Sequence, residues 1–547
     1  EPRAAPRRDA RTVVALLAVW ALGVALVDLR GDFPLNDDWA YGLAVRRLLD
    51  EGVFRPPGWA APTLLSQALW GAAAALPGGF SYTALRLSTL LLGGLAIAGV
   101  YGLARALHAR RGAAALAALT LGFGPVFFDL AHTFMTDVPF VALAVLALLG
   151  FARALEGGGD RALAVGCAAT VAAVLCRQTG LLLPIAFAIA QLATRRGGLA
   201  ARLPRALLPL LLAGAALGLL RVLLARDGGA SGGLGTGDVL AAWQMRGNPP
   251  AALRLIRDNL FTALLYCGLF LAPALLHSCT AWRAALRRPR VFDCIAALTA
   301  AGGLAVLWAW QRRMPLRGNV LIESGLGPIT LHDVYIRGLP DDGPLPAAFW
   351  LLVTAIAIAG AALLTAQLAA ALATLRRAPA PAARRLLLLG AAGYLAAVSL
   401  VIPFDRYYLP LVALLAAALA PPAWTAPNRV ARGAAVGLLA AMAAFSVAAT
   451  HDYLSWNRAR WQALAQLAAD GVAPERIDGG PEFTGPHFYR PDYRAARGKS
   501  WWWVADDEFI VSMGPLPGYA VRRRYPYARW LPTGAGEIMV LQRSSGS

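Results

Sequence analysis

Four short polar segments stand out in this strongly apolar chain, because each carries side chains that could bind anions or transfer protons. They are residues 36–41 (NDDWAY), 132–139 (HTFMTDVP), 177–180 (RQTG) and 404–410 (FDRYYLP). A carboxylate can accept the proton of an attacking hydroxyl group. An arginine can hold a departing phosphate through two parallel hydrogen bonds. This set of side chains suits the transfer of a group from a phosphate-linked donor.

The elements that carry these segments are predicted to be membrane-spanning helices. Of the 547 residues, 58% are hydrophobic and 15% are charged, and the mean hydropathy is +0.55, which indicates a polytopic membrane protein. The first apolar run lacks a small-residue cleavage site, so we expect a retained helix and not a signal peptide. Apolar runs predict about thirteen spans, near residues 13–29, 84–104, 112–128, 138–152, 162–176, 180–194, 206–224, 259–279, 291–310, 347–374, 386–402, 408–420 and 433–449.

The net charge of +20 follows the predicted topology. If the N-terminus is inside, the inner segments hold 23 Arg and four acidic residues. The three long outer loops, residues 30–60, 225–258 and 311–346, hold 12 Arg and 12 acidic residues. This is the positive-inside pattern of membrane proteins, and it argues against nucleic acid as a partner. We therefore expect a cytoplasmic N-terminus, with all four polar segments at the outer face of the membrane.

The predicted fold class is an all-α polytopic membrane domain, residues 1–449, followed by a small extracytoplasmic α/β domain, residues 450–547. An odd number of spans sends the second domain to the outer face. In that domain the pattern predicts one amphipathic helix and three strands, at residues 456–469, 509–513, 520–524 and 537–542.

Two further regions have a distinctive pattern. The first outer loop contains two helix-compatible stretches, residues 39–50 and 63–75, which we expect to lie along the membrane surface. Residues 162–176 and 180–194 are short for spans, and they fit either two spans or one re-entrant hairpin.

Each candidate residue also has a purely structural interpretation. Asp37 or Asp38 could cap the helix that follows, and Asp137 could be a helix N-terminal residue stabilised by the dipole. His132 could be a satisfied interfacial histidine, and Arg177 could extend to the lipid headgroups. The remaining alternatives are a structural ion pair of Asp405 with Arg406, an aromatic belt of Tyr407 and Tyr408, and either sugar stacking or bilayer anchoring by residues 501–503.

The order of these segments resembles the glycosyltransferase C superfamily, in particular the bacterial branch similar to protein O-mannosyltransferases and lipid A aminoarabinose transferases. The matching segments are Asp37-Asp38, residues 134–139 (FMTDVP), Arg177-Gln178 and residues 405–410 (DRYYLP). The resemblance covers nearly the whole chain and is strongest over residues 30–195. It implies a polyprenyl-phosphate-linked sugar donor and transfer at the outer face of the cytoplasmic membrane.

The resemblance also implies roles for these residues. The acid of the first loop is the catalytic base in such proteins, which falls here on Asp37 or Asp38, with Asp38 preferred. Asp137 would be a second functional acid. By their chemistry, the arginines are assigned to the leaving phosphate and four other side chains to the substrate: Arg177 and Arg406, and His132, Gln178, Tyr407 and Tyr408.

The expected reaction is the inverting transfer of a single hexosyl or pentosyl unit to an exported glycan, lipid or protein hydroxyl group. We expect no required cofactor, since no dense acidic metal cluster is present. The sequence does not decide whether a divalent metal takes part. One alternative is a lipid-linked-sugar flippase, whose charges would line a cavity at mid-membrane depth. The other is an O-antigen ligase or polymerase, for which loop 311–346 offers Arg312, Arg313, Arg317, His332 and Arg337.

Overall fold

Ten helices in the described part of the chain are long and apolar enough to cross a membrane, so the chain is a multi-pass membrane protein. The computed structural model describes residues 4–60, 63–194, 198–226, 247–331, 344–375, 381–421, 428–494 and 502–544. The ten helices are α1 (Ala4–Leu26), α4 (Tyr82–Ala106), α7 (Asp137–Leu155), α8 (Gly159–Cys176), α10 (Leu199–Arg226), α12 (Pro249–Ala285), α13 (Pro289–Trp310), α15 (Ala347–Leu375), α16 (Ala382–Ser399) and α18 (Arg429–Ala469).

The predicted number of thirteen full spans is not confirmed, because three of the apolar runs form short or broken helices. The run at 112–128 divides into α5 (Arg111–Gly122) and α6 (Pro125–Ala131), bent by 64° where Pro125 cannot donate a backbone hydrogen bond. Counting this pair as one span gives eleven. The other two are α17 (Leu409–Ala418) and α9 (Leu182–Leu192), which follows the 3-10 turn η1 (Gln178–Leu181). Ten or eleven helical residues rise about 15–17 Å, roughly half the hydrocarbon thickness.

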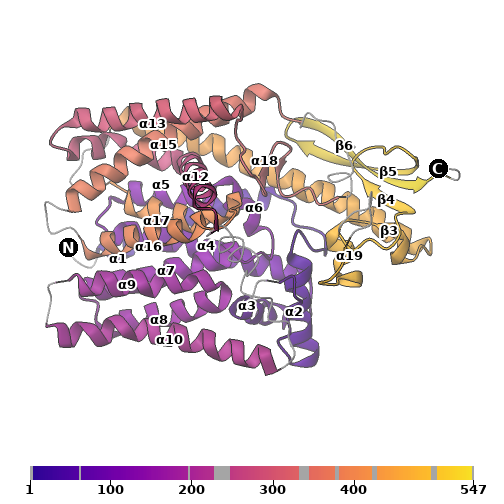
Figure 1. Ribbon diagram of the computed structural model, residues 1–547, viewed down its shortest axis with the longest axis horizontal. Coiled ribbons are helices and arrows are strands. Elements are labelled where there is room, and N and C mark those ends of the chain that lie inside the picture. Colours follow the sequence, from indigo (N-terminus) through magenta and orange to yellow (C-terminus); the bar gives the residue numbers. More distant parts are fainter. Residues whose placement is uncertain are drawn as a thin grey trace.

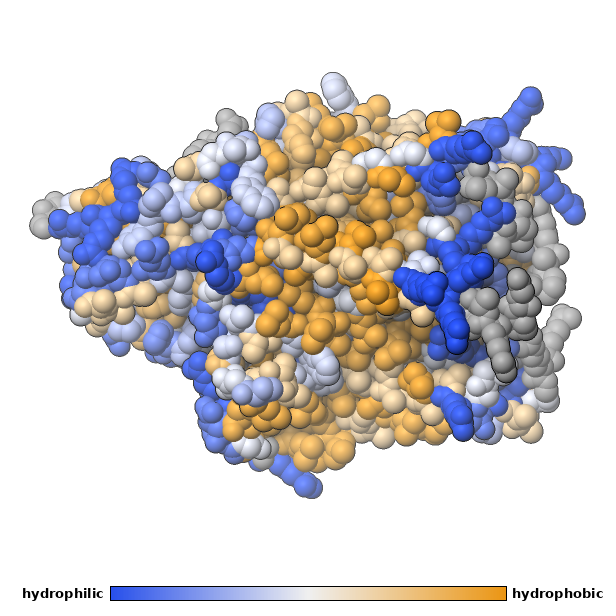
Figure 2. All heavy atoms as spheres, turned by 180° about the vertical axis from the view of Figure 1, so that it is seen from behind, coloured by the Kyte–Doolittle hydropathy of each residue, from blue (hydrophilic) through white to orange (hydrophobic). Residues whose placement is uncertain are grey.

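The surface of the molecule agrees with this division into spans and end regions. Figure 2 shows a broad hydrophobic belt over the middle of the helical part, with hydrophilic residues gathered at both ends. The N-terminus and the C-terminal sheet lie at opposite ends of the bundle (Figure 1). Segments that face lipid must be apolar because the hydrocarbon offers no hydrogen bonds, so the belt marks the region that spans the membrane.

Both predicted surface helices of the first loop are present. They are α2 (Asp38–Glu51) and α3 (Leu65–Ala75). In Figure 1, α2 runs across the ends of the helices α7, α8, α9 and α10 and not parallel to them. It ends at Gly52, whose left-handed φ of 70° suits glycine at a helix C-terminus. This helix brings the acidic pair to the end of the bundle nearest the C-terminal sheet.

The C-terminal region is joined to the membrane part by one continuous helix. Helix α18 has 41 residues and passes the predicted boundary at 449/450 without a break, so the predicted helix at 456–469 is its last part. The three predicted strands are confirmed as β4 (Phe509–Ser512), β5 (Tyr519–Trp530) and β6 (Thr533–Arg543).

These strands form a four-stranded sheet in the order β3-β4-β6-β5, completed by the short β3 (Ile477–Asp478). Strands β3 and β4 are parallel, and the other pairs are antiparallel. The sheet packs on α18, and α19 (Pro481–Phe488) packs on α2. Two short turns, η3 (Asp405–Tyr408) and η4 (Pro474–Arg476), and the hairpin of β1 (Leu321–Ile322) with β2 (Gly325–Leu326) complete the elements.

Candidate active site

A cavity of about 460 Å³ lies where the first loop, the α8–η1 junction and η3 meet. Helix α16 and the residues directly after it contribute Tyr394 and an apolar stretch, Ala397, Val398 and Val401. The polar lining includes Asp37, Tyr41, Arg177, Gln178, Arg406 and Tyr407. All four polar segments singled out in the sequence therefore contribute to one cavity, although the first and the last lie more than 360 residues apart in the chain.

Asp37 is the carboxylate of the first loop that faces this cavity. It directly precedes α2, but its side chain makes no capping hydrogen bond, so helix capping does not account for it. One oxygen, Oδ1, accepts a hydrogen bond from Trp59 Nε1 at 2.7 Å. The other, Oδ2, lies 3.6 Å from Arg406 Nη2, and the side chain is 19% exposed. Asp37 is thus oriented, partly accessible and next to a cation.

Asp38 points away from the cavity into the protein. It is 2% exposed, and its carboxylate accepts hydrogen bonds from the backbone N–H of Phe134 at 2.9 Å and of Leu35 at 3.4 Å. Burial raises the pKa of Asp38 to about 8, since the charged form loses its hydration. Asp38 ties the first loop to residues 132–136. Of the two acids of the first loop, Asp37 lines the cavity and Asp38, preferred as the base from the sequence, does not.

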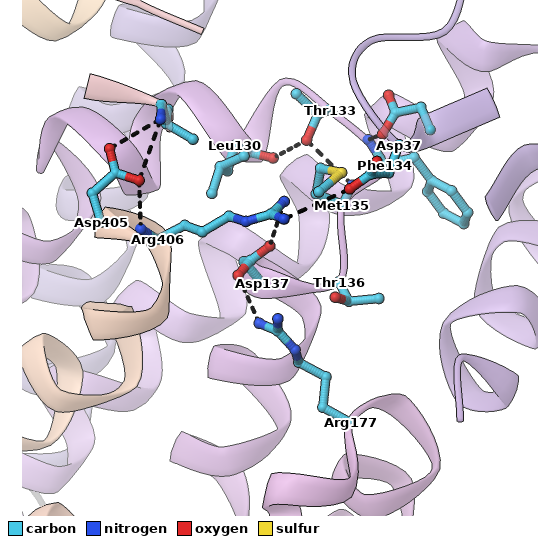
Figure 3. Close-up of polar contacts among 12 residues, drawn as sticks. Asp37, Leu130, Thr133, Phe134, Met135, Thr136, Asp137, Arg177, Asp405 and Arg406 are labelled. Carbon is cyan, nitrogen blue, oxygen red and sulfur yellow. Dashed lines mark hydrogen bonds and ion pairs between the residues drawn. The ribbon is translucent and has the colours of Figure 1, made fainter. Parts of the chain in front are cut away.

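Asp137 organises the two arginines of the cavity. It is the first residue of α7 and is 1% exposed. Its Oδ1 pairs with Arg177 Nη1 at 2.6 Å, and its Oδ2 lies 4.0 Å from Arg406 Nη1. Figure 3 shows the Arg406 guanidinium between Asp37 and Asp137, with Arg177 reaching Asp137 from the other side. Arg177 therefore binds inside the protein and does not extend to the lipid headgroups.

Arg406 has donors left for a ligand. Among the described residues its Nε and Nη1 atoms have no hydrogen-bond partner, although both are buried. Its neighbour Asp405 is not its ion-pair partner: Asp405 accepts backbone N–H bonds from Val320, Leu321 and Arg406 itself. Burial raises the pKa of Asp405 to about 6 while these N–H groups oppose the rise. Asp405 thus fixes the turn that presents the Arg406 side chain to the cavity.

Two of the predicted substrate-binding residues are not brought to the cavity. His132 is 1% exposed, its Nδ1 lies 2.7 Å from the carbonyl oxygen of Phe128, and its ring packs on that phenyl ring. Tyr408 is fully buried and stacks on Tyr266. Both side chains pack in the interior, and neither lines the cavity. Gln178 and Tyr407 do line it.

The structure adds residues that the sequence pattern missed. Trp59 holds Asp37, and Tyr394 lines the cavity. Trp59 belongs to no motif that the sequence pattern could reveal, because it lies in a loop rich in Pro and Gly. The two described tryptophans of the 501–503 run, Trp502 and Trp503, are 8% and 4% exposed and pack on Trp59. Neither is a bilayer anchor or an open stacking surface, and residue 501 lies outside the described residues.

The described residues contain no group of three or more His, Cys, Asp or Glu side chains that could hold a metal ion. In the loop considered for a ligase, Arg313 pairs with Glu323 at the surface and Arg317 donates to Asn259. Neither arginine lines the cavity at Asp37, and residues 332 and 337 lie outside the described part.

Comparison with known families gives one match. Residues 63–221 match the family of dolichyl-phosphate-mannose-protein mannosyltransferases. No curated protein matches the chain in sequence. The matched segment contains Asp137 and Arg177. The resemblance to glycosyltransferases of the O-mannosyltransferase type that the sequence predicts is thus confirmed over these residues.

Several solved structures are similar at low identity. ArnT from Cupriavidus metallidurans, bound to undecaprenyl phosphate, is 15% identical over 98% of each chain, with a TM-score of 0.48. The Pmt1-Pmt2 O-mannosyltransferase complex of S. cerevisiae, bound to its sugar donor, is 16% identical with a TM-score of 0.34. That match covers 40% of this chain and 34% of the yeast chain. The archaeal oligosaccharyltransferase AglB from Archaeoglobus fulgidus is 17% identical over 81% and 55% of the two chains, with a TM-score of 0.40. The chain thus spans about a third of the yeast protein and about half of the archaeal one.

Proposed function

We propose that the chain is a membrane glycosyltransferase that moves one sugar from a polyprenyl phosphate to a hydroxyl group of an exported glycan, lipid or protein. The observation that carries the proposal is the cavity itself: one oriented carboxylate, Asp37, faces two arginines, Arg177 and Arg406. The family match over residues 63–221 gives independent support for a lipid-phosphate donor.

In the proposed step the acceptor oxygen attacks the anomeric carbon and forms the new glycosidic bond. The bond from that carbon to the phosphate oxygen breaks, and its electron pair leaves with the polyprenyl phosphate. Asp37 takes the hydroxyl proton, and attack opposite the leaving group inverts the anomeric configuration. Hydrogen bonds from Arg177 and Arg406 stabilise the charge that grows on the phosphate. We assign no metal or organic cofactor to this step, because the two guanidinium groups supply the positive charge.

The charges of the cavity suit the binding of a phosphate. Asp37, Asp137, Arg177 and Arg406 sum to zero, so a phosphate finds no excess of negative charge. Because Arg406 Nε and Nη1 have no hydrogen-bond partner among the described residues, a phosphate can bind without first breaking a hydrogen bond there. The apolar wall from α16 offers a surface for the first isoprene units.

The proposed orientation puts the N-terminus in the cytoplasm and the cavity at the outer face of a bacterial inner membrane. The Arg excess of the inner segments supports it. The N-terminus and the C-terminal sheet at opposite ends of the bundle agree with an odd number of crossings (Figure 1).

The test measures sugar transfer in proteoliposomes with a panel of radiolabelled polyprenyl-phosphate sugars. The variants are Asp37→Asn and Asp38→Asn. We expect the wild type to transfer sugar. The rate of transfer should fall by about 10²–10⁴-fold in Asp37→Asn, which is the usual contribution of a general base. Binding of undecaprenyl phosphate to Asp37→Asn should remain, because the arginines are unchanged.

Other outcomes would reject parts of the proposal. Full activity of Asp37→Asn would remove the assigned base. Movement of a lipid-linked sugar across the bilayer without any transfer would support the flippase. Transfer only from pyrophosphate-linked glycans would support the ligase or polymerase.

A further inference from the structure

The first loop is held from outside the membrane part by α19, in the C-terminal region. Glu482 on α19 is 1% exposed, and its Oε1 accepts a hydrogen bond from the backbone N–H of Asn36 at 3.0 Å. Thr330 Oγ1 donates to the same oxygen at 2.6 Å. The other oxygen, Oε2, pairs with Arg460 Nη2 at 2.7 Å, and Arg460 is fully buried.

This contact falls next to Asp37 in the chain. Asn36 adopts a left-handed φ of 56°, a conformation that costs free energy for residues other than glycine and is tolerated best by Asn and Asp. The bond from Glu482 holds this residue where the chain turns into α2. The direction in which the next side chain, that of Asp37, leaves the backbone depends on that turn.

A second contact reaches the carboxylate itself. Trp59, whose Nε1 donates to Asp37, stands edge-on to Trp503 with ring centroids 5.0 Å apart. The Trp503 ring also packs on Trp39 of α2, with ring centroids 5.6 Å apart. Its φ of 58° is unusual for a bulky residue and persists only where surrounding contacts fix it.

Helix α19 packs closely on α2. A Cβ atom on Gly485 would come within 2.7 Å of the Trp39 ring. Arg177, in contrast, pairs with Asp137 within the membrane part, and Arg406 is presented by the turn that Asp405 fixes, between Asp137 and Asp37. The base and the phosphate ligands are thus positioned by different parts of the chain.

We propose that the C-terminal region completes the active site by positioning Asp37, through Glu482 on the backbone of Asn36 and through Trp503 on Trp59. Glu482 and Trp503 are positioning residues, since neither lines the cavity. This inference rests on the proposed function of Asp37 as the base. Its consequence is a separation of effects: loss of these contacts lowers the rate of transfer and leaves the binding of the lipid phosphate intact.

The experiment compares Glu482→Ala, Glu482→Gln, Trp503→Leu and Trp59→Phe. The matched controls are Glu508→Gln, which removes an exposed ion pair with Arg476 in the same region, and Trp530→Phe, whose ring stacks on His451. We measure kcat for sugar transfer and the Kd of undecaprenyl phosphate. Displacement of a reacting group by about 1 Å can lower the rate about 10²-fold.

We expect Glu482→Ala and Trp503→Leu to lower kcat by about that factor with the Kd changed less than about threefold. Glu482→Gln keeps an acceptor oxygen for Asn36 and should recover part of the rate. Removing the charge beside buried Arg460 can prevent folding. If Glu482→Ala does not fold, Trp503→Leu decides, because it removes the ring that packs on Trp59 and leaves the buried Glu482–Arg460 pair in place.

Hydrogen–deuterium exchange gives a readout that does not require activity. In the Glu482 variants, the amides of residues 33–41 should exchange faster, while those of residues 174–181 stay protected. If the wild type transfers no sugar, the proposed function fails, and the exchange data still test the positioning. The inference is overturned if kcat matches the controls in folded variants, or if kcat and lipid-phosphate affinity fall together.

Discussion

Replacing Arg406 tests whether the cavity holds the donor phosphate. Its guanidinium lies between Asp37 and Asp137, and two of its nitrogens have no hydrogen-bond partner among the described residues. Arg406→Gln removes the charge and the two-pronged geometry together. Arg406→Lys keeps the charge but offers a compact ammonium in place of the planar fork.

The expected loss follows from the bonds that the phosphate would make. A hydrogen bond to a charged group contributes about 1.5–3 kcal/mol, so losing one weakens binding roughly 10- to 150-fold, at about 1.4 kcal/mol per factor of ten. In Arg406→Gln the charges of Asp37, Asp137, Arg177 and residue 406 sum to −1 and no longer to zero, which adds repulsion. We expect Arg406→Gln to weaken phosphate binding within this range of roughly 10- to 150-fold. Arg406→Lys should weaken it about tenfold, because it loses one hydrogen bond of the pair.

The assay is equilibrium binding of radiolabelled undecaprenyl phosphate to purified protein in detergent. Arg313→Gln is the control, because Arg313 pairs with Glu323 at the surface and does not line the cavity. Its Kd should equal that of the wild type. An Arg406→Gln protein that is folded and binds as tightly as the control would refute the assignment of Arg406 to the phosphate.

Two further predictions concern stability. Because burial raises the pKa of Asp38 to about 8 from 3.8, the folded state keeps a proton that the unfolded state releases. Stability should therefore fall as the pH rises from about 4 to 8, by at most about 1.4 kcal/mol per unit. Melting temperatures from pH 5 to 8 should show a flatter profile for Asp38→Asn, and equal slopes would contradict this. A Cβ on Gly268 of α12 would collide with the Ala361 backbone of α15, so Gly268→Ala should lower stability by about 1–3 kcal/mol. Gly302→Ala in α13 meets nothing within 4 Å and should leave the melting temperature unchanged or higher.

The predicted membrane class and most element positions were right because they depend on local hydropathy. All thirteen apolar runs contain helices, and the surface helices α2 and α3 were found from short amphipathic stretches. The number of full spans was not predictable in this way. Apolar character does not report where a helix stops, and it did not indicate the 64° bend at Pro125 or the 3-10 turn before α9.

The cavity shows the same division between local and tertiary information. Residue type and order pointed to Asp37, Arg177, Gln178, Arg406 and Tyr407, which do line it. Residue type and order could not separate Asp37 from Asp38, because adjacent residues at a helix start point in different directions. Only the contacts of α2 fix which of the two side chains faces the cavity.

The sequence by itself determined that this is a polytopic membrane protein with charged side chains concentrated in a few segments, since hydropathy and charge bias are summed over the chain. Only the tertiary structure decided which of those side chains share a cavity. His132 and Tyr408 carry the right chemistry but pack into the interior, whereas Trp59 carries no motif and holds Asp37. The direction of a side chain depends on residues hundreds of positions away, such as Glu482 beside Asn36, and no local pattern encodes that.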